Sequence, residues 1–98
     1  MTDVKVEVKT LDDLQPDPNN ANKHTVRGHQ LVENSLRRRG AFRSVAAAGK
    51  GVDKPVVMAG NLTIEKARDA GFTEVIFVHT NGRQLVSVIR DDIEPGSP

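Results

Sequence analysis

The chain contains no cysteine, and this absence excludes several classes of site at once. Without thiols there is no disulfide scaffold, no thiolate zinc site and no cysteine nucleophile. Aromatic rings are also scarce, because three phenylalanines stand without any tryptophan or tyrosine. A base-stacking platform for single-stranded nucleic acid is therefore not expected. No apolar run approaches the length of a membrane span or a signal-peptide core, which predicts a cytoplasmic protein with no membrane partner.

What the chain does contain is the composition of one small globular domain. Its 98 residues are 37% apolar and 28% charged, enough for one modest core. The net charge of +1 hides an uneven distribution, since residues 23–54 hold eight basic and two acidic side chains. That segment carries +6 and the remainder carries −5. The asymmetry is typical of a surface that faces a polyanion, although a solvated helix end gives the same pattern.

Hydrophobic periodicity predicts an α+β fold with seven elements in the order β-α-β-β-α-β-β. A single domain is expected over residues 1–90, with a polar tail over 91–98. The predicted elements are a strand over 4–9, a helix over 25–39, strands over 43–48 and 55–58, a helix over 62–70, a central strand over 73–78 and a return strand over 84–90. The dipeptide Asn81-Gly82 predicts a hairpin turn before the last strand.

The most informative local feature is the corner at Ala59-Gly60-Asn61, where an apolar strand ends and a helical pattern begins at once. Backbone N–H groups at the start of a helix lie at its positive end and can bind an anion. Gly60 allows another group to approach the backbone closely, and Asn61 is a good N-cap residue. Most strand-to-helix corners only join two elements, so both interpretations remain open on this feature alone.

Several motifs occur together in a characteristic order. They are Leu14 to Asn20, then Glu33-Asn34-Ser35-Leu36, then Gly40-Ala41-Phe42-Arg43-Ser44, then Ala59-Gly60-Asn61. Their order and spacing resemble the ParB/sulfiredoxin superfamily and, within it, small ParB-like nuclease domains of phages and actinobacteria. The resemblance covers nearly the whole chain and implies a phage-type protein with that α+β fold.

The resemblance also implies a nucleotide site at the corner. Partition ParB proteins read Gly-Glu-Arg-Arg there and hold a nucleoside triphosphate, whereas sulfiredoxin uses a cysteine, a histidine and ATP. In this chain Leu62 and Thr63 occupy the positions of the charged residues, and the cysteine is absent. Sulfiredoxin chemistry is thereby excluded, and we expect the chain not to be an active nucleotide hydrolase.

The predicted ligand site combines the corner with the loop that follows the first helix. Gly60 and Asn61 would supply backbone donors, Thr63 and Ser44 hydroxyl groups, and Arg43 a guanidinium that can bind phosphate in a bidentate manner. An ordinary surface arginine is the alternative at position 43. The candidate ligand is a nucleotide or a nucleic-acid backbone, and the candidate cofactor is a nucleoside triphosphate with magnesium.

His24 is the candidate catalytic residue, because a histidine beside such a site can act as a general base or bind phosphate. A histidine at a loop-to-helix junction also often caps or packs locally. No metal site is expected, since the three histidines lack the spacing of metal ligands. The carboxylates of Asp12, Asp13 and Asp17 cluster near the first loop, but neighbouring side chains such as Asp12 and Asp13 diverge.

The candidate nucleic-acid-binding residues are Arg37, Arg38 and Arg39. Three consecutive arginines spread over a helical turn, which suits phosphate contacts rather than base reading. Their cations also complement the negative end of the helix dipole without any ligand. The leading function is therefore phosphorylated-ligand binding, DNA included. The alternatives are a regulatory module that binds a host or phage protein and a hydrolytic nuclease, which would need clustered acids or a positioned base.

Overall fold

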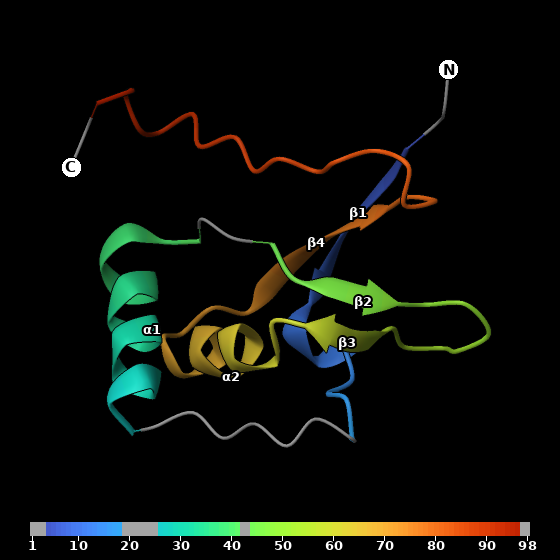
Figure 1. Ribbon diagram of the computed structural model, residues 1–98, viewed down its shortest axis with the longest axis horizontal. Coiled ribbons are helices and arrows are strands. Elements are labelled where there is room, and N and C mark those ends of the chain that lie inside the picture. Colours follow the sequence, from blue (N-terminus) through green and yellow to red (C-terminus); the bar gives the residue numbers. More distant parts are fainter. Residues whose placement is uncertain (1–3, 19–25, 42–43, 97–98) are drawn as a thin grey trace.

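The computed structural model describes residues 4–18, 26–41 and 44–96 of the chain. It is a small α+β structure with two helices and four strands among these residues (Figure 1). The elements are β1 (Lys5–Thr10), a 3₁₀ helix η1 (Leu11–Asp13), α1 (Val26–Arg39), β2 (Ala46–Ala48), β3 (Val56–Ala59), α2 (Asn61–Asp69) and β4 (Glu74–His79).

The strands form two separate antiparallel pairs. β1 pairs with β4 from Lys5 opposite His79 to Thr10 opposite Glu74, and β2 pairs with β3 through a register shift after Ala46. The prediction of a central strand at 73–78 is wrong, because β4 has β1 as its one strand partner in the described part of the chain. The segment after η1 joins the second pair, since Gln15 bridges to β3 through bonds of 2.8 Å to Pro55 and Val57.

The core lies where the two helices meet η1. Leu11, Leu36 and Ala67 form its buried centre, and partly buried apolar side chains surround them. The predicted spacing of Val32 and Leu36 is confirmed, because a four-residue interval places both on the face of α1 that packs against this core. The two helices and η1 are thus packed together through this core.

The predicted return strand over 84–90 is absent. The chain bends at Gly82, with φ 83° and its N–H donating to the Thr80 hydroxyl over 3.0 Å, but the predicted hairpin does not form because residues 84–90 make no strand after the bend. Residues 84–90 then run as an irregular segment toward the C-terminal end of α1 (Figure 1). Arg90 binds the backbone there, and Leu85, earlier in the segment, is 98% exposed.

Candidate functional site

The corner between β3 and α2 turns within one residue. Gly60 adopts the left-handed conformation at φ 101° and is itself the N-cap, so Asn61 is already the first residue of α2. The predicted capping role of Asn61 is therefore wrong. Its side chain instead accepts a hydrogen bond from the Asp17 N–H and donates one to the Val57 carbonyl, each over 3.2 Å. Asn61 thus fastens the first loop to the corner.

The space beside Gly60 is occupied by Val45. A Cβ atom added to Gly60 would collide with Val45 Cγ1 and would lie 2.9 Å from Val45 Cβ. A group does approach this glycine closely, as expected, but on the side where a Cβ would stand that group is the Val45 side chain of the protein itself. The N–H groups of Asn61, Leu62 and Thr63 precede the first i→i−4 bond of α2, which Ile64 makes to the Gly60 carbonyl.

The contact of Val45 with Gly60 also places the preceding loop. Ser44 is exposed and directly precedes Val45, and Thr63 is half-buried in the first turn of α2. Three predicted ligand-binding residues, Gly60, Asn61 and Thr63, lie at this corner, and Ser44 is the chain neighbour of the Val45 that packs against it. Arg43 and His24, which were also predicted, lie outside the described residues.

The three arginines at the end of α1 do not play equal parts. Arg37 forms an ion pair of 3.0 Å with Glu33 and also donates to the Asp69 carbonyl at the end of α2. The Arg37 side chain therefore links α1 to α2 and has a structural role. Arg38 and Arg39 are exposed on the last turn of α1, where they leave positive charge on the surface.

A cavity of about 470 Å³ lies between the first loop and α2. Four carboxylates line it, Asp12, Asp17, Glu65 and Asp69, and Arg68 forms a 3.0 Å pair with Asp12. Acidic groups outnumber the single arginine, so a phosphate is disfavoured in this cavity. Among the residues that the structure describes, no three histidine or carboxylate side chains converge as a metal site requires.

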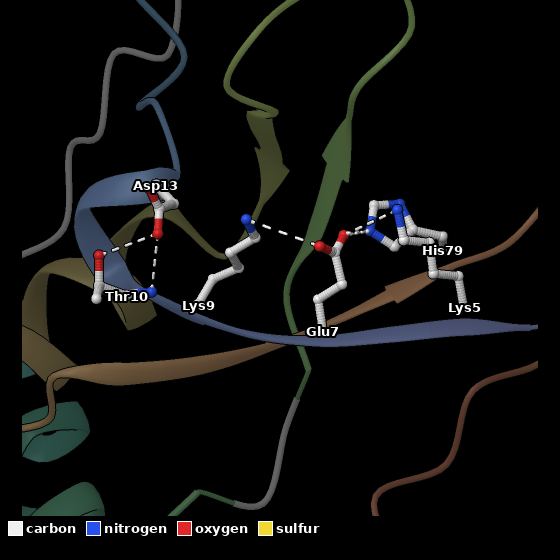
Figure 2. A network of polar contacts seen from close by, with 6 residues as sticks. All are labelled: Lys5, Glu7, Lys9, Thr10, Asp13 and His79. Carbon is white, nitrogen blue, oxygen red and sulfur yellow. Dashed lines mark hydrogen bonds and ion pairs between the residues drawn. The ribbon is translucent and has the colours of Figure 1, made fainter.

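A second hollow of about 520 Å³ lies between the two strand pairs. Glu7 on β1 binds His79 on β4 at 2.7 Å, and Lys9 approaches the same carboxylate at 3.7 Å (Figure 2). The hydrogen bond from His79 is the main cause that lowers the pKa of Glu7. The sequence analysis missed this cluster because it depends on the register, in which Glu7 and His79 are diagonal neighbours on one face.

Sequence reasoning also missed Arg90, whose guanidinium covers the C-terminal end of α1. The residue was assigned to a return strand, and its sequence neighbours give no sign of a contact 51 positions away. The one available signal was Asp92, two residues later, because an Arg-x-Asp pair can bind locally.

Comparison with known proteins supports the fold through structural similarity at low sequence identity. No protein-family model and no curated protein sequence matches the chain. The structure is similar to the C-terminally truncated chromosome-partitioning protein ParB from Caulobacter crescentus complexed with CTP-γ-S, with a TM-score of 0.54 and 22% identity. The match covers 74% of this chain and 42% of that protein, so the chain spans less than half the length of this neighbour.

The expected ParB-like fold is therefore confirmed, while the narrower phage-type assignment stays a prediction. Neither helix in the described ranges has the length and apolar character that crossing a membrane requires.

Proposed function

We propose that the chain binds a phosphorylated ligand, a nucleotide in first place, at the corner between β3 and α2. The observation that carries the proposal is the meeting of three features: the free start of α2, the left-handed Gly60, and the loop bearing Ser44 that Val45 fastens beside them. The likeness to a ParB complexed with a CTP analogue supports a nucleotide over other anions.

The chemistry of the site is donation of hydrogen bonds to phosphate oxygens. The first turn of α2 would contribute backbone N–H groups and the Thr63 hydroxyl, and the loop would contribute Ser44 and the expected guanidinium of Arg43. No acidic residue occurs in the first turn of α2. The first turn of α2 therefore offers a magnesium ion no carboxylate ligand of its own.

Binding without turnover is the expected behaviour. Leu62 and Thr63 supply neither a general base nor a positive charge to stabilise a phosphoryl transition state. Purified chain should release phosphate from CTP or ATP no faster than buffer does. Turnover that disappears in a His24→Ala variant would instead identify an enzyme.

The test is a thermal-shift and calorimetric titration with CTP, ATP and GTP, with and without magnesium. A ligand at one hundred times its Kd adds about 2.7 kcal/mol to the free energy of unfolding, so Tm should rise. Gly60→Val is a poor probe because it collides with Val45. Thr63→Val and Ser44→Ala remove hydroxyl groups at nearly constant volume, and Arg43→Ala removes the guanidinium.

The matched control is Arg83→Ala, which removes an exposed arginine from the turn after β4. We expect Arg43→Ala and Thr63→Val to weaken nucleotide binding while the control leaves it unchanged. No shift with any nucleotide, or equal affinity in all variants, would overturn the proposed site.

A nucleic-acid backbone is a second candidate ligand for the same surface. Its specific support is the exposed pair Arg38 and Arg39 at the end of α1, from which the loop to Ser44 departs. These side chains offer phosphate contacts without base recognition. The regulatory-module and nuclease alternatives have no comparable support in the described residues.

A further inference from the structure

The segment after β4 returns to the end of α1 and is held there by Arg90. Its Nη1 donates to the carbonyl of Arg39 over 2.7 Å and to the carbonyl of Ala41 over 3.3 Å. The same guanidinium binds both oxygens of Asp92, at 2.8 Å through Nε and 2.7 Å through Nη2. The side chain of Arg90 is only 23% exposed. One residue thus joins the C-terminal segment to the start of the loop between α1 and β2.

Gly40 makes room for this contact. It ends α1 at φ 76°, with its N–H bonded to the Leu36 carbonyl over 3.0 Å. A Cβ atom at this position would lie 3.2 Å from Nη1 and 3.3 Å from Nη2 of Arg90. The glycine therefore serves both the helix end and the close approach of the guanidinium.

The loop from Gly40 to Val45 is consequently fastened at both ends. Arg90 binds the carbonyls on either side of Gly40, and Val45 packs onto Gly60 at the corner. The residue Ser44, which the proposed site uses, lies between these two attachments. Holding the chain at Ala41 and at Val45 reduces the conformations open to Ser44 before a ligand binds, and this lowers the entropic cost of binding.

We infer that Arg90 is a positioning residue for the ligand site, which makes the segment from β4 to Asp92 part of that site. The inference rests on the proposed function. Arg90 itself contacts backbone carbonyls and a carboxylate, so its role is to hold the loop, not to bind phosphate. An arginine is required because its planar fork can donate to the α1 carbonyls and to Asp92 together, whereas a lysine ammonium is a point donor.

The experiment compares Arg90→Ala and Arg90→Lys with the control Arg83→Ala in the full chain. The first readout is amide hydrogen exchange of Gly40, Ala41 and Ser44 without ligand. The second is the Kd for CTP by calorimetry, with Tm of the free protein measured alongside. We expect exchange of the loop amides to accelerate in Arg90→Ala while the Val57 amide stays protected. The Kd, measured well below the Tm of each variant, should rise about tenfold in Arg90→Ala, and Arg90→Lys should not restore it.

Two further variants keep the test decisive if Arg90→Ala fails to fold. Asp92→Asn keeps the guanidinium but weakens its bidentate partner, and Gly40→Ala crowds it, so each should show the same two effects at smaller size. Loop exchange equal to that of the control would overturn the inference, whatever the nucleotide result. Faster exchange with an unchanged Kd would also overturn it. Wild-type chain that binds no nucleotide would overturn the proposed function, and Arg90 would then be a structural contact alone.

Discussion

Gly60 shows how one glycine can be explained by the protein rather than by a ligand. The left-handed conformation at φ 101° and the contact with Val45 both require a residue without Cβ. The first requirement is local and is shared with Gly71, at φ 93°, which has nothing within 4 Å of an added Cβ. The steric requirement applies to Gly60 and not to Gly71. Comparing substitutions at Gly60 and Gly71 therefore separates the cost of the left-handed backbone from the cost of the collision with Val45.

Gly60→Ala should destabilise the chain more than Gly71→Ala does. Both substitutions force a non-glycine residue into the left-handed region, at a cost of about 1–2 kcal/mol. Gly60→Ala must also displace Val45, and such overpacking adds about 1–3 kcal/mol. Urea unfolding at pH 7 measures both values. In a Val45→Ala background the excess at Gly60 should shrink, because the collision with Cγ1 is removed while the Cβ of residue 45 remains 2.9 Å away. Equal costs of the two substitutions in the wild type would contradict this account.

Asp13 links the first strand to η1 and makes stability depend on acid. Its carboxylate accepts hydrogen bonds from the Thr10 N–H at 3.0 Å and the Thr10 hydroxyl at 3.1 Å (Figure 2). The backbone hydrogen bond is the main cause that lowers the pKa of Asp13 in the folded chain. The stabilisation is thus fully present above the unfolded pKa of about 3.9 and is lost as pH falls through the lower folded pKa.

Asp13→Asn should therefore be less stable than the wild type at pH 7, and the gap should narrow as the solution is acidified below about pH 4. Urea midpoints measured at several pH values give the comparison. Asp53→Asn, in the exposed turn before β3, is the control substitution. A gap between wild type and Asp13→Asn that stays constant down to pH 2 would show that the carboxylate charge is not responsible.

At the scale of the elements, α1 packs against the core through one face and exposes the opposite face. Leu36 is 8% exposed in the core with Leu11 and Ala67, while Leu31 on the same helix is 59% exposed. Leu36→Ala should lower the free energy of unfolding by about 2–5 kcal/mol, because it removes buried methyl groups and leaves a cavity. Leu31→Ala should change it by less than about 0.5 kcal/mol. Thermal or urea unfolding of the two variants tests the assignment of the buried face, which similar losses would contradict.

Six of the seven elements that the sequence predicted are present in the structure, because each of them carries its own local pattern. The helices and their glycine ends follow from residues such as Val32, Leu36 and Gly40, which lie close together in the chain. The seventh element failed for the opposite reason. Residues 84–90 are rich in valine and isoleucine, as strands are, but Arg90 is bound to carbonyls about fifty residues earlier, and no local pattern contains that contact.

The candidate site was predictable to a similar extent. The corner at Gly60 and the helix after it follow from local sequence, and so does the position of Thr63 in the first turn. The contact of Val45 with Gly60 and the side-chain bonds of Asn61 to Asp17 and Val57 do not, because they depend on how distant segments pack.

At the scale of the whole molecule, the structure shows where part of the positive charge of residues 23–54 lies. The +6 segment over residues 23–54 includes α1, and the exposed arginines at its end lie beside the loop that Arg90 fastens. The charge of Arg37 is less available to a polyanion, because this side chain is paired with Glu33 and hydrogen-bonded to α2. The surface available to a polyanion is therefore smaller than the run of three arginines predicts.

Any binding of DNA should accordingly be weak, independent of sequence and steeply dependent on salt. Each phosphate contact releases counterions and contributes about 0.9 to the slope of log K against log salt. The double variant Arg38→Ala, Arg39→Ala should reduce that slope by about two units if both side chains meet phosphates. Arg37→Ala should change the slope less and should lower Tm, because it removes the links to Glu33 and Asp69. Fluorescence anisotropy with duplexes of unrelated sequence, at several salt concentrations, compares both variants with the wild type. A tight complex selective for one sequence at high salt would refute backbone contacts as the basis of binding.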